Sequence, residues 1–452
     1  MPPATSWAAA WGEQVTYFWW GIFWIGVYLI LALFPTVVLL LAPIPGGNGF
    51  LFDLAAALGY AGTTMAAVMF FLTARFKRAT LPFGIDIVYY FHRQIALVVF
   101  LFILLHPLLM ASADPDMLRG LQPAAISFTM AAGVFSWLFF TMIIVTSLWR
   151  KQLGLHYDAW RYLHALLAVA ALLLAIVHIG GAGLYIATPA KRLLWIAIVL
   201  SWVLLLAYVR IVKPFSLLKT PYRVADLQEE RGNAWTLTVK PAGHKGLTFQ
   251  PGQFVWLTAW SQPFAMKEHP FSIASSAQDP AALQFTIKEL GDFTRRIKEM
   301  PRGLPVYVDG PYGAFSIDRH PAAHYVFLAG GIGIAPIMSM LRTLADRQDQ
   351  SRQTLIYAYN RLEGLTFYEE LERLPGRLAL KVVYVLQSPT AAWRGERGFI
   401  TEQILKTHLP ATFADTECFV CGPVPMIRQA EKLLCGLGAP LAKIHSELFD
   451  LV

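Results

Sequence analysis

Long apolar stretches dominate the first half of the chain, and short segments of alternating polarity dominate the second half. A helix needs about 20 apolar residues to cross the hydrocarbon core of a membrane. Six stretches approach or exceed this length, at residues 18–42, 50–73, 87–111, 124–148, 162–181 and 193–212. The pattern therefore predicts a six-helix transmembrane bundle within residues 1–215.

The second half reads as two further domains. Alternating strands separated by Gly and Pro turns, as at 235–240, 254–258 and 283–287, predict an antiparallel β-barrel domain at residues 216–320. From residue 325 onward, strands alternate with helices, as at 325–329, 336–346, 355–359 and 367–373. This alternation predicts a doubly wound α/β nucleotide-binding domain at residues 321–452.

The distribution of charge agrees with this division. Of 452 residues, 56% are hydrophobic and only 15% are charged, which excludes a disordered chain and argues against a purely soluble protein. Residues 1–215 hold 12 of the 37 Lys and Arg and 6 of the 29 Asp and Glu. The net charge of +8 lies mostly in membrane loops, where it reports orientation, and no nucleic-acid partner is expected.

The basic residues also predict the topology. They gather after the second, fourth and sixth stretches, namely Arg75, Lys77, Arg78, Arg150, Lys151, Lys213, Lys219 and Arg223. These ends should face the cytoplasm, which places both termini and the soluble module inside, although Lys191 and Arg192 go against the rule. No positive region precedes the first stretch, so we expect it to remain in the mature protein.

Only three cysteines occur, and all lie in the soluble half, as suits a reducing compartment. Cys418 and Cys421 form a C-x-x-C spacing, but a second pair is missing. We therefore expect no zinc site at these thiols.

Four histidines stand in the apolar stretches, where ionisable residues are costly and usually functional. They are His92 and His106 in the third stretch and His164 and His178 in the fifth. A spacing of 14 residues returns to within about 40° of the same helix face and separates the rings by ~21 Å. Both stretches run from inside to outside, so His92 pairs with His164 at the inner level and His106 with His178 at the outer level.

Two stacked pairs of imidazoles predict two b-type haems. Neutral imidazole suits haem iron, and two axial histidines leave no open coordination position, an arrangement for electron transfer. The alternative is that each histidine merely forms a hydrogen bond with a neighbouring helix.

Three motifs in the soluble half suggest nucleotide binding. A predicted strand leads into a glycine-rich loop at residues 330–336 and then a helix, where backbone amides can approach a phosphate. Residues 269–276 lie on a barrel strand whose serines could contact a flavin, and residues 291–294 begin a helix that could accept a pyrophosphate. The alternatives are an ordinary turn, an ordinary strand and simple helix capping.

Together with residues 309–313 (Asp-Gly-Pro-Tyr-Gly), Cys421-Gly422-Pro423 and a Phe near the C-terminus, these motifs occur in an order that resembles the NADPH oxidase and ferric reductase family. That family joins a haem-bearing six-helix domain to a ferredoxin-reductase-like module for FAD and a nicotinamide dinucleotide. The short chain is most similar to bacterial members. It has no calcium-binding loop of the EF-hand type, and we expect no obligatory activator subunit.

The resemblance implies roles for individual residues. The expected FAD contacts are His269, Pro270, Phe271, Ser272, Ser275 and Thr294, with Phe449 resembling the terminal aromatic residue that covers the flavin. The expected contacts of the nicotinamide dinucleotide are Gly331, Gly333, Pro336, Cys421, Gly422 and Pro423. Arg361 follows a strand where a cation would meet a 2′-phosphate, which favours NADPH over NADH, and Arg394 or Arg397 could share this role.

The sequence thus predicts an NADPH oxidase or ferric-reductase-type oxidoreductase, integral to membrane lipid and expected in a bacterial inner membrane. Electrons would pass from NADPH to FAD, to the inner haem, to the outer haem and then to a small-molecule acceptor on the far side, with dioxygen giving superoxide as the first choice. A ferric-chelate reductase would use the same chain of cofactors. A quinone-linked cytochrome b subunit also holds two haems by four histidines, but the attached nucleotide module argues against it.

Overall fold

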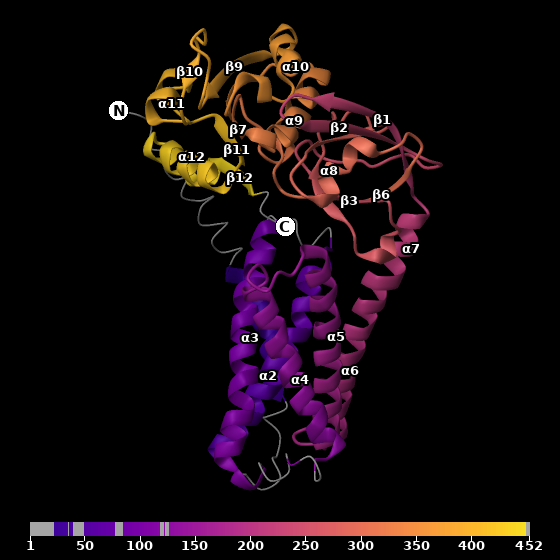
Figure 1. The fold of residues 1–452 in the computed structure, drawn as a ribbon. Helices are drawn as coiled ribbons and strands as arrows, with labels where there is room; N and C mark the ends of the chain where they lie inside the picture. The colour runs from indigo at the N-terminus through magenta and orange to yellow at the C-terminus, as the bar shows by residue number, and fades with distance from the viewer. Residues whose placement is uncertain are drawn as a thin grey trace. The chain divides into compact units, whose positions relative to one another are not determined.

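The computed structural model describes residues 22–34, 36–38, 49–76, 85–117, 122 and 126–448. Its internal contacts divide it into two compact units, each described here by itself. The helical unit comprises Trp20–Phe76 and Ile87–Lys213, and the other, which we call the nucleotide unit, contains Pro214–Val452 (Figure 1).

The helical unit is a bundle of long apolar helices (Figure 1). They are α2 (Phe50–Thr73), α3 (Ile85–Ala113), α4 (Phe128–Leu148), α5 (Tyr157–Ala182) and α6 (Pro189–Ala207), and all five are long and apolar enough to cross a membrane. Helix α6 continues through a π-helical turn, Tyr208–Val212, into α7 (Lys213–Leu218). Of the first predicted stretch, residues 22–34 and 36–38 are described and are helical, so the sixth spanning helix remains a prediction.

The outer surface of these helices is apolar. Leu166 and Leu193 are each 68% exposed, and Leu204 is 60% exposed. Side chains of this size and number would be unfavourable in water but are what a helix presents to lipid. The chain is therefore an integral membrane protein.

The first part of the nucleotide unit is an antiparallel sheet with the strand order β4-β3-β6-β1-β2-β5. Its strands are β1 (Tyr222–Glu230), β2 (Ala234–Pro241), β3 (Phe254–Ala259), β4 (His269–Ser272), β5 (Leu283–Lys288) and β6 (Pro305–Tyr312). The two edge strands approach each other through a bridge between Ile273 and Phe285, both completely buried. The sheet thus curls around its core as the alternating pattern predicted. The short helix α8 (Asp292–Arg295) follows β5.

The second part is a parallel sheet with the strand order β10-β9-β8-β7-β11-β12. Its elements are β7 (His324–Gly330), α9 (Ile334–Asp346), β8 (Arg352–Tyr359), α10 (Tyr368–Arg373), β9 (Ala379–Leu386), β10 (Glu396–Arg397), α11 (Glu402–His408), β11 (Thr416–Gly422), α12 (Val424–Gly436) and β12 (Ile444–Leu448). One buried cluster joins the sheet to α9 and α10, and another joins it to α11 and α12. The fold is therefore doubly wound.

Helix α9 fastens the two sheets of this unit together. Arg342 Nη1 donates to the Ala274 carbonyl at 2.7 Å and to Gln284 at 2.9 Å, while its Nε and Nη2 bind both oxygens of Glu370. One helical turn earlier, Ser339 donates to the Ser275 carbonyl at 2.7 Å. Since all these groups are buried or half-buried, they fix the orientation of the antiparallel sheet against the parallel sheet.

Candidate functional site

The structure pairs the four membrane histidines as the spacing predicted. The His92 and His164 ring centroids lie 6.3 Å apart, and those of His106 and His178 lie 6.2 Å apart. Both pairs join α3 to α5.

This separation fits two rings on one metal ion. A metal–imidazole bond is about 2.0 Å, and a ring nitrogen lies about 1.1 Å from its ring centroid, so coaxial ligands place the centroids about 6.2 Å apart. Histidines that merely bonded to each other would come closer. The residues present therefore fit a bis-histidine haem at each level.

The outer pair is held in the tautomer that ligation requires. His106 Nδ1 donates to the Ala55 carbonyl at 2.8 Å, and His178 Nδ1 donates to the Thr129 carbonyl at 2.9 Å. A carbonyl can only accept, so Nδ1 carries the proton and Nε2 offers its lone pair. A carbonyl partner on the remote nitrogen is the usual companion of a metal-binding histidine.

Glycines make room for these two rings. A Cβ atom at Gly59 would lie 2.9 Å from the His106 ring, and one at Gly133 would lie 2.6 Å from the His178 ring. Gly59 follows Ala55 by four residues, and Gly133 follows Thr129 by four. Each neighbouring helix therefore presents, on the same face, a carbonyl acceptor and a space where a glycine has no side chain. We call this space the notch.

The rings of the inner pair are held by weaker contacts than those of the outer pair. His164 Nδ1 lies 3.4 Å from Ser147 Oγ, and the Trp160 ring lies 5.3 Å from the His164 ring. His92 Nδ1 is buried without a hydrogen-bond partner among the described residues. Within the part of the chain that the structure describes, the inner rings therefore lack the carbonyl acceptors that orient the outer rings.

In the nucleotide unit, the predicted dinucleotide residues meet at one edge of the parallel sheet. The strand order reverses between β7 and β11, which is where doubly wound folds bind nucleotides at the carboxyl ends of strands. Gly331 and Gly333 follow β7, Gly422 ends β11 and Pro423 comes directly after it. The structure thus brings together two motifs that are about 90 residues apart in the sequence.

Close backbone contact explains the glycines of this edge. A Cβ at Gly333 would lie 2.3 Å from the Cys421 carbonyl oxygen, so the loop can pack against β11 only with glycine there. Gly331 has a φ of +55° and open space around its Cα, while its carbonyl accepts a hydrogen bond from Tyr357 at 3.1 Å. Pro336 stands in the first turn of α9, where proline is tolerated.

Cys421 and Arg361 lie at the same edge but in different surroundings. Cys421 is completely buried, and burial together with the nearby Glu447 raises the pKa of its thiol well above the usual value. Arg361 is exposed just beyond the carboxyl end of β8, beside β7. Cys418 faces the opposite side of β11 from Cys421, so the two thiols cannot bind one ion.

The predicted flavin residues lie on β4. The His269 ring stacks on Phe293 of α8 at 4.0 Å, and Phe271 stacks on the same ring at 5.9 Å, with Pro270 between them on the strand. Ser272 is 6% exposed, and its hydroxyl has no hydrogen-bond partner among the described residues. An unpaired buried hydroxyl is costly, so it fits a ligand such as a flavin ring edge.

Two other predicted flavin residues are engaged within the protein. Thr294 Oγ1 accepts from the amides of Leu290 and Gly291, both at 2.9 Å, as in ordinary helix capping. Ser275 Oγ accepts from the Gln284 amide at 3.2 Å. Phe449 lies outside the described residues, so its contact with the flavin stays a prediction.

Sequence reasoning missed two features because their partners are far apart in the chain. Tyr185 donates to the carboxylate of Asp53, and Tyr60 donates to the Leu184 carbonyl at 2.5 Å, which ties the α5–α6 loop to α2. In the nucleotide unit, two histidines and a glutamate gather at the amino ends of β11 and β12. No spacing or local pattern marks either group.

Three protein-family profiles match successive parts of the chain. A ferric reductase-like transmembrane component matches residues 58–175, an FAD-binding domain matches residues 219–316, and an oxidoreductase NAD-binding domain matches residues 327–432. The first covers α3 and most of α5 and includes His92, His106 and His164, while His178 lies three residues beyond its end. The second covers the antiparallel sheet, and the third covers most of the parallel sheet.

Individual proteins resemble parts of the chain. A stachydrine N-demethylase reductase subunit of Rhizobium meliloti is 29% identical over 49% of this chain and 64% of its own length. NADH-cytochrome b5 reductase 1 of Candida albicans is 34% identical over 36% of this chain and 57% of its own length. The chain thus spans less than two thirds of these curated relatives.

Solved structures resemble the chain at lower identity. The FAD/NAD-binding domain of nitric oxide dioxygenase from Vibrio cholerae has 22% identity and a TM-score of 0.45, covering 51% of this chain and 98% of its own. A flavohemoglobin from Malassezia yamatoensis has 18% identity and a TM-score of 0.47, covering 75% of this chain and 91% of its own.

Proposed function

Since the chain has the domain architecture of the NADPH oxidase and ferric reductase family, with a ferredoxin-reductase-like module after the membrane component, we propose that it passes electrons from NADPH through FAD and two haems to an acceptor on the far side of the membrane. The chain is an oxidoreductase with FAD-binding and NAD-binding domains. We place the nucleotide unit in the cytoplasm of a bacterium, on the basic residues at the inner helix ends, and propose that no activator subunit is required.

One observation carries this proposal. Two imidazole pairs join the same two apolar helices, with centroid separations of 6.3 and 6.2 Å. A single pair could be a local packing feature. Two pairs at the separation of coaxial ligands, spaced ~21 Å apart along the helices, provide sites at two depths of the membrane.

The residues of this chain supply binding and orientation. When bound, NADPH delivers hydride to FAD, which can release electrons singly to haem iron. The Gly331–Gly333 loop would hold the pyrophosphate of the dinucleotide against α9, and Arg361 would hold the 2′-phosphate. The Ser272 hydroxyl would bind the flavin, and the Nε2 atoms of the four histidines would hold the two irons.

Dioxygen is the acceptor that this arrangement favours. If each histidine pair held one haem, no ligand position would remain open at the metal, so the acceptor would receive its electron without binding the iron. Dioxygen can accept one electron in this way, giving superoxide. The name of the transmembrane family profile favours a second candidate, a ferric chelate, which would also accept single electrons at this surface.

Anaerobic stopped-flow spectroscopy tests the proposal. Full-length protein loaded with FAD is reduced with NADPH and then mixed with oxygen, while a probe sensitive to superoxide dismutase records superoxide. Rapid haem oxidation with stoichiometric superoxide is the expected result. If NADPH reduces the haems but oxygen reoxidises them only slowly, dioxygen is not the acceptor, which must then be sought among ferric chelates and quinones. If NADPH reduces no haem, the electron path is wrong.

Replacement of one outer ligand tests the haem assignment. His178→Leu should reduce the haem content from two to one per chain and stop transfer to the outer acceptor, while NADPH still reduces FAD. The matched control is His156→Leu, because His156 is exposed at the start of α5 and its side chain caps nothing. Equal haem content in the two variants would show that His178 is not a ligand.

A further inference from the structure

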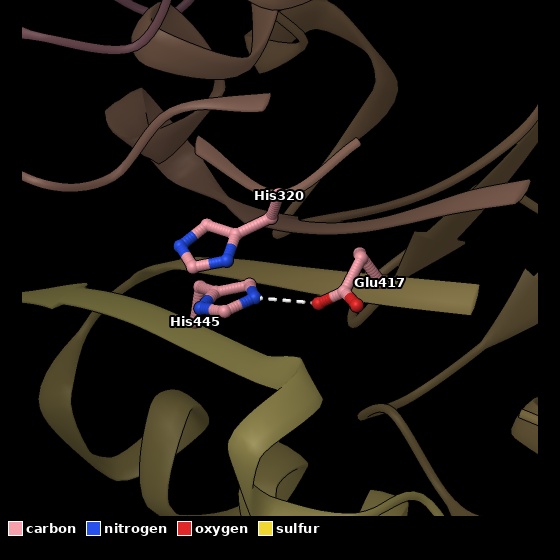
Figure 2. A group of neighbouring side chains, drawn as sticks. All are labelled: His320, Glu417 and His445. Carbon is pink, nitrogen blue, oxygen red and sulfur yellow. Dashed lines mark hydrogen bonds and ion pairs between the residues drawn. The ribbon is translucent and has the colours of Figure 1, made fainter. Parts of the chain in front are cut away.

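Two histidines and a glutamate converge in the nucleotide unit, away from every residue assigned above. His320 lies in the connection between β6 and β7, Glu417 is the second residue of β11, and His445 is the second residue of β12. Their three side chains point toward one another (Figure 2). Their ligand atoms all lie within 4.8 Å of one another, and each residue is half-buried.

The register of the strands explains why these side chains meet. In the parallel pairing of β11 with β12, Phe419 lies beside His445, and Glu417 lies two residues before Phe419 on the same face. The His445 Nε2 atom is 2.7 Å from Glu417 Oε2. His320 closes the group from above, with its ring stacked on the His445 ring at 3.7 Å (Figure 2).

We propose that His320, Glu417 and His445 form a site for a divalent transition-metal ion, with Zn²⁺ as the preferred occupant. Two imidazole nitrogens and one carboxylate oxygen are a known zinc donor set, which leaves a fourth position for water. Calcium and magnesium are disfavoured because they take oxygen ligands. The half-buried position leaves a path by which an ion can enter.

The surroundings suit a metal site. His445 packs against the Phe419 ring at 4.9 Å, and Phe419 in turn packs against Phe315 at 5.3 Å, so one side of the group is apolar and dry. The His320 ring contacts the rings of His445 and Phe419, and rotation of its side chain can turn a ring nitrogen toward an ion. Zn²⁺ with bonds of about 2.0–2.1 Å needs ligand atoms about 3.3 Å apart, so His320 must move inward and the ring stack must open.

The location indicates what the ion would do. The group lies at the amino ends of β11 and β12, whereas the dinucleotide edge lies at the carboxyl ends of the strands. His320 belongs to the segment that leaves the antiparallel sheet, and its two partners belong to the last two strands of the parallel sheet. A bound ion would tie the connection to these strands and raise the stability of the nucleotide unit without entering the electron path.

Calorimetric titration of the full-length, tag-free protein with Zn²⁺, after treatment with a chelator, tests the site. We expect one equivalent to bind with a rise in melting temperature. Glu417→Gln and His320→Gln should each weaken this binding by at least the ~10–100-fold seen when mere outer partners of metal ligands are removed. The matched control is His408→Gln, which breaks a similar pair, His408–Glu396 at 2.8 Å, that has no third ligand among the described residues.

Fold integrity and ligand identity are checked separately. Haem content and circular dichroism should be the same in all variants, and Glu417→Gln keeps the shape of the side chain, so a loss of binding in that variant reports the ligand and not unfolding. X-ray absorption should show nitrogen and oxygen neighbours. Equal Zn²⁺ binding in wild type and both site variants, or sulfur neighbours at about 2.3 Å, would overturn the proposal.

Discussion

Replacement of Gly133 by alanine should release the outer haem while leaving the inner one. The new Cβ would lie 2.6 Å from His178 Nδ1, whereas ordinary contacts begin at 3.4 Å. The backbone of α4 cannot yield without breaking its own hydrogen bonds, so the ring must withdraw by about 0.8 Å. Metal–ligand distances tolerate only about ±0.2 Å.

The expected size of the effect follows from the same contact. Overpacking of a filled interior costs about 1–3 kcal/mol, which corresponds to about 5- to 140-fold weaker haem binding. The tilted ring also loses its 2.9 Å hydrogen bond to the Thr129 carbonyl, which orients Nε2. Alanine is the better helix former by about 1 kcal/mol, so the change should not unfold α4 by itself.

The assay is haem content per chain, together with the rate of haem transfer to excess apomyoglobin. Gly133→Ala should lose one of two haems, or release one much faster than the other. Gly180→Ala is the control, since a Cβ there meets nothing within 4 Å although Gly180 lies two residues from His178. Two haems with unchanged release rates in Gly133→Ala would refute the idea that the notch seats a ligand ring.

Two substitutions and one labelling experiment test the nucleotide unit. Ser272→Ala should raise the melting temperature of flavin-free protein, because it removes an unpaired buried hydroxyl that costs about 1–3 kcal/mol. The same change should weaken FAD binding. A lower melting temperature without flavin would contradict this. Gly333→Ala should raise the Kd for NADPH more than about tenfold while FAD content is kept, since its Cβ would lie 2.3 Å from the Cys421 carbonyl oxygen. Unchanged kinetics of reduction by NADPH would disprove this. Alkylation of the native protein at pH 8 should modify exposed Cys435 alone. Cys418 and Cys421 are buried, and burial raises their pKa, to about 12 for Cys418, so that they form little thiolate. Mass spectrometry showing more than one modified thiol would refute this.

Local patterns were sufficient for most of the elements. The predicted stretch at residues 50–73 coincides with α2, because a membrane helix is bounded simply by where its apolar run ends. Helix α5 begins at Tyr157, five residues before its predicted start, because its first turn contains Asp158 and Arg161 and lacks an apolar pattern. The strands of the soluble half were located within one to three residues, since alternation and glycine turns are local signals.

The pairing of the histidines was also predictable from the sequence, but the hydrogen-bond acceptors that orient their rings were not. A 14-residue repeat on two parallel helices fixes which rings meet, and both ring pairs are observed. The carbonyl acceptors at Ala55 and Thr129 carry no side-chain signal, because any residue has a carbonyl. The group of His320, Glu417 and His445 was invisible for a different reason, since it depends on the pairing of β11 with β12 and on the path of a loop.

The relation between carbonyl and glycine shows how a helix can accept a ring without losing its own structure. The carbonyl of residue i in an α-helix points toward residue i+4, so a donor that approaches this oxygen from outside must pass over the side chain of residue i+4. At Ala55 and Thr129 those residues are Gly59 and Gly133, and in both cases a Cβ would meet the ring at less than 3.0 Å. The inner rings, with a 3.4 Å contact to Ser147 and an unpaired His92 Nδ1, have no such seat. Because the two outer seats arise on different helices from the same residue spacing, the fold constrains the outer histidine pair more tightly than the inner one.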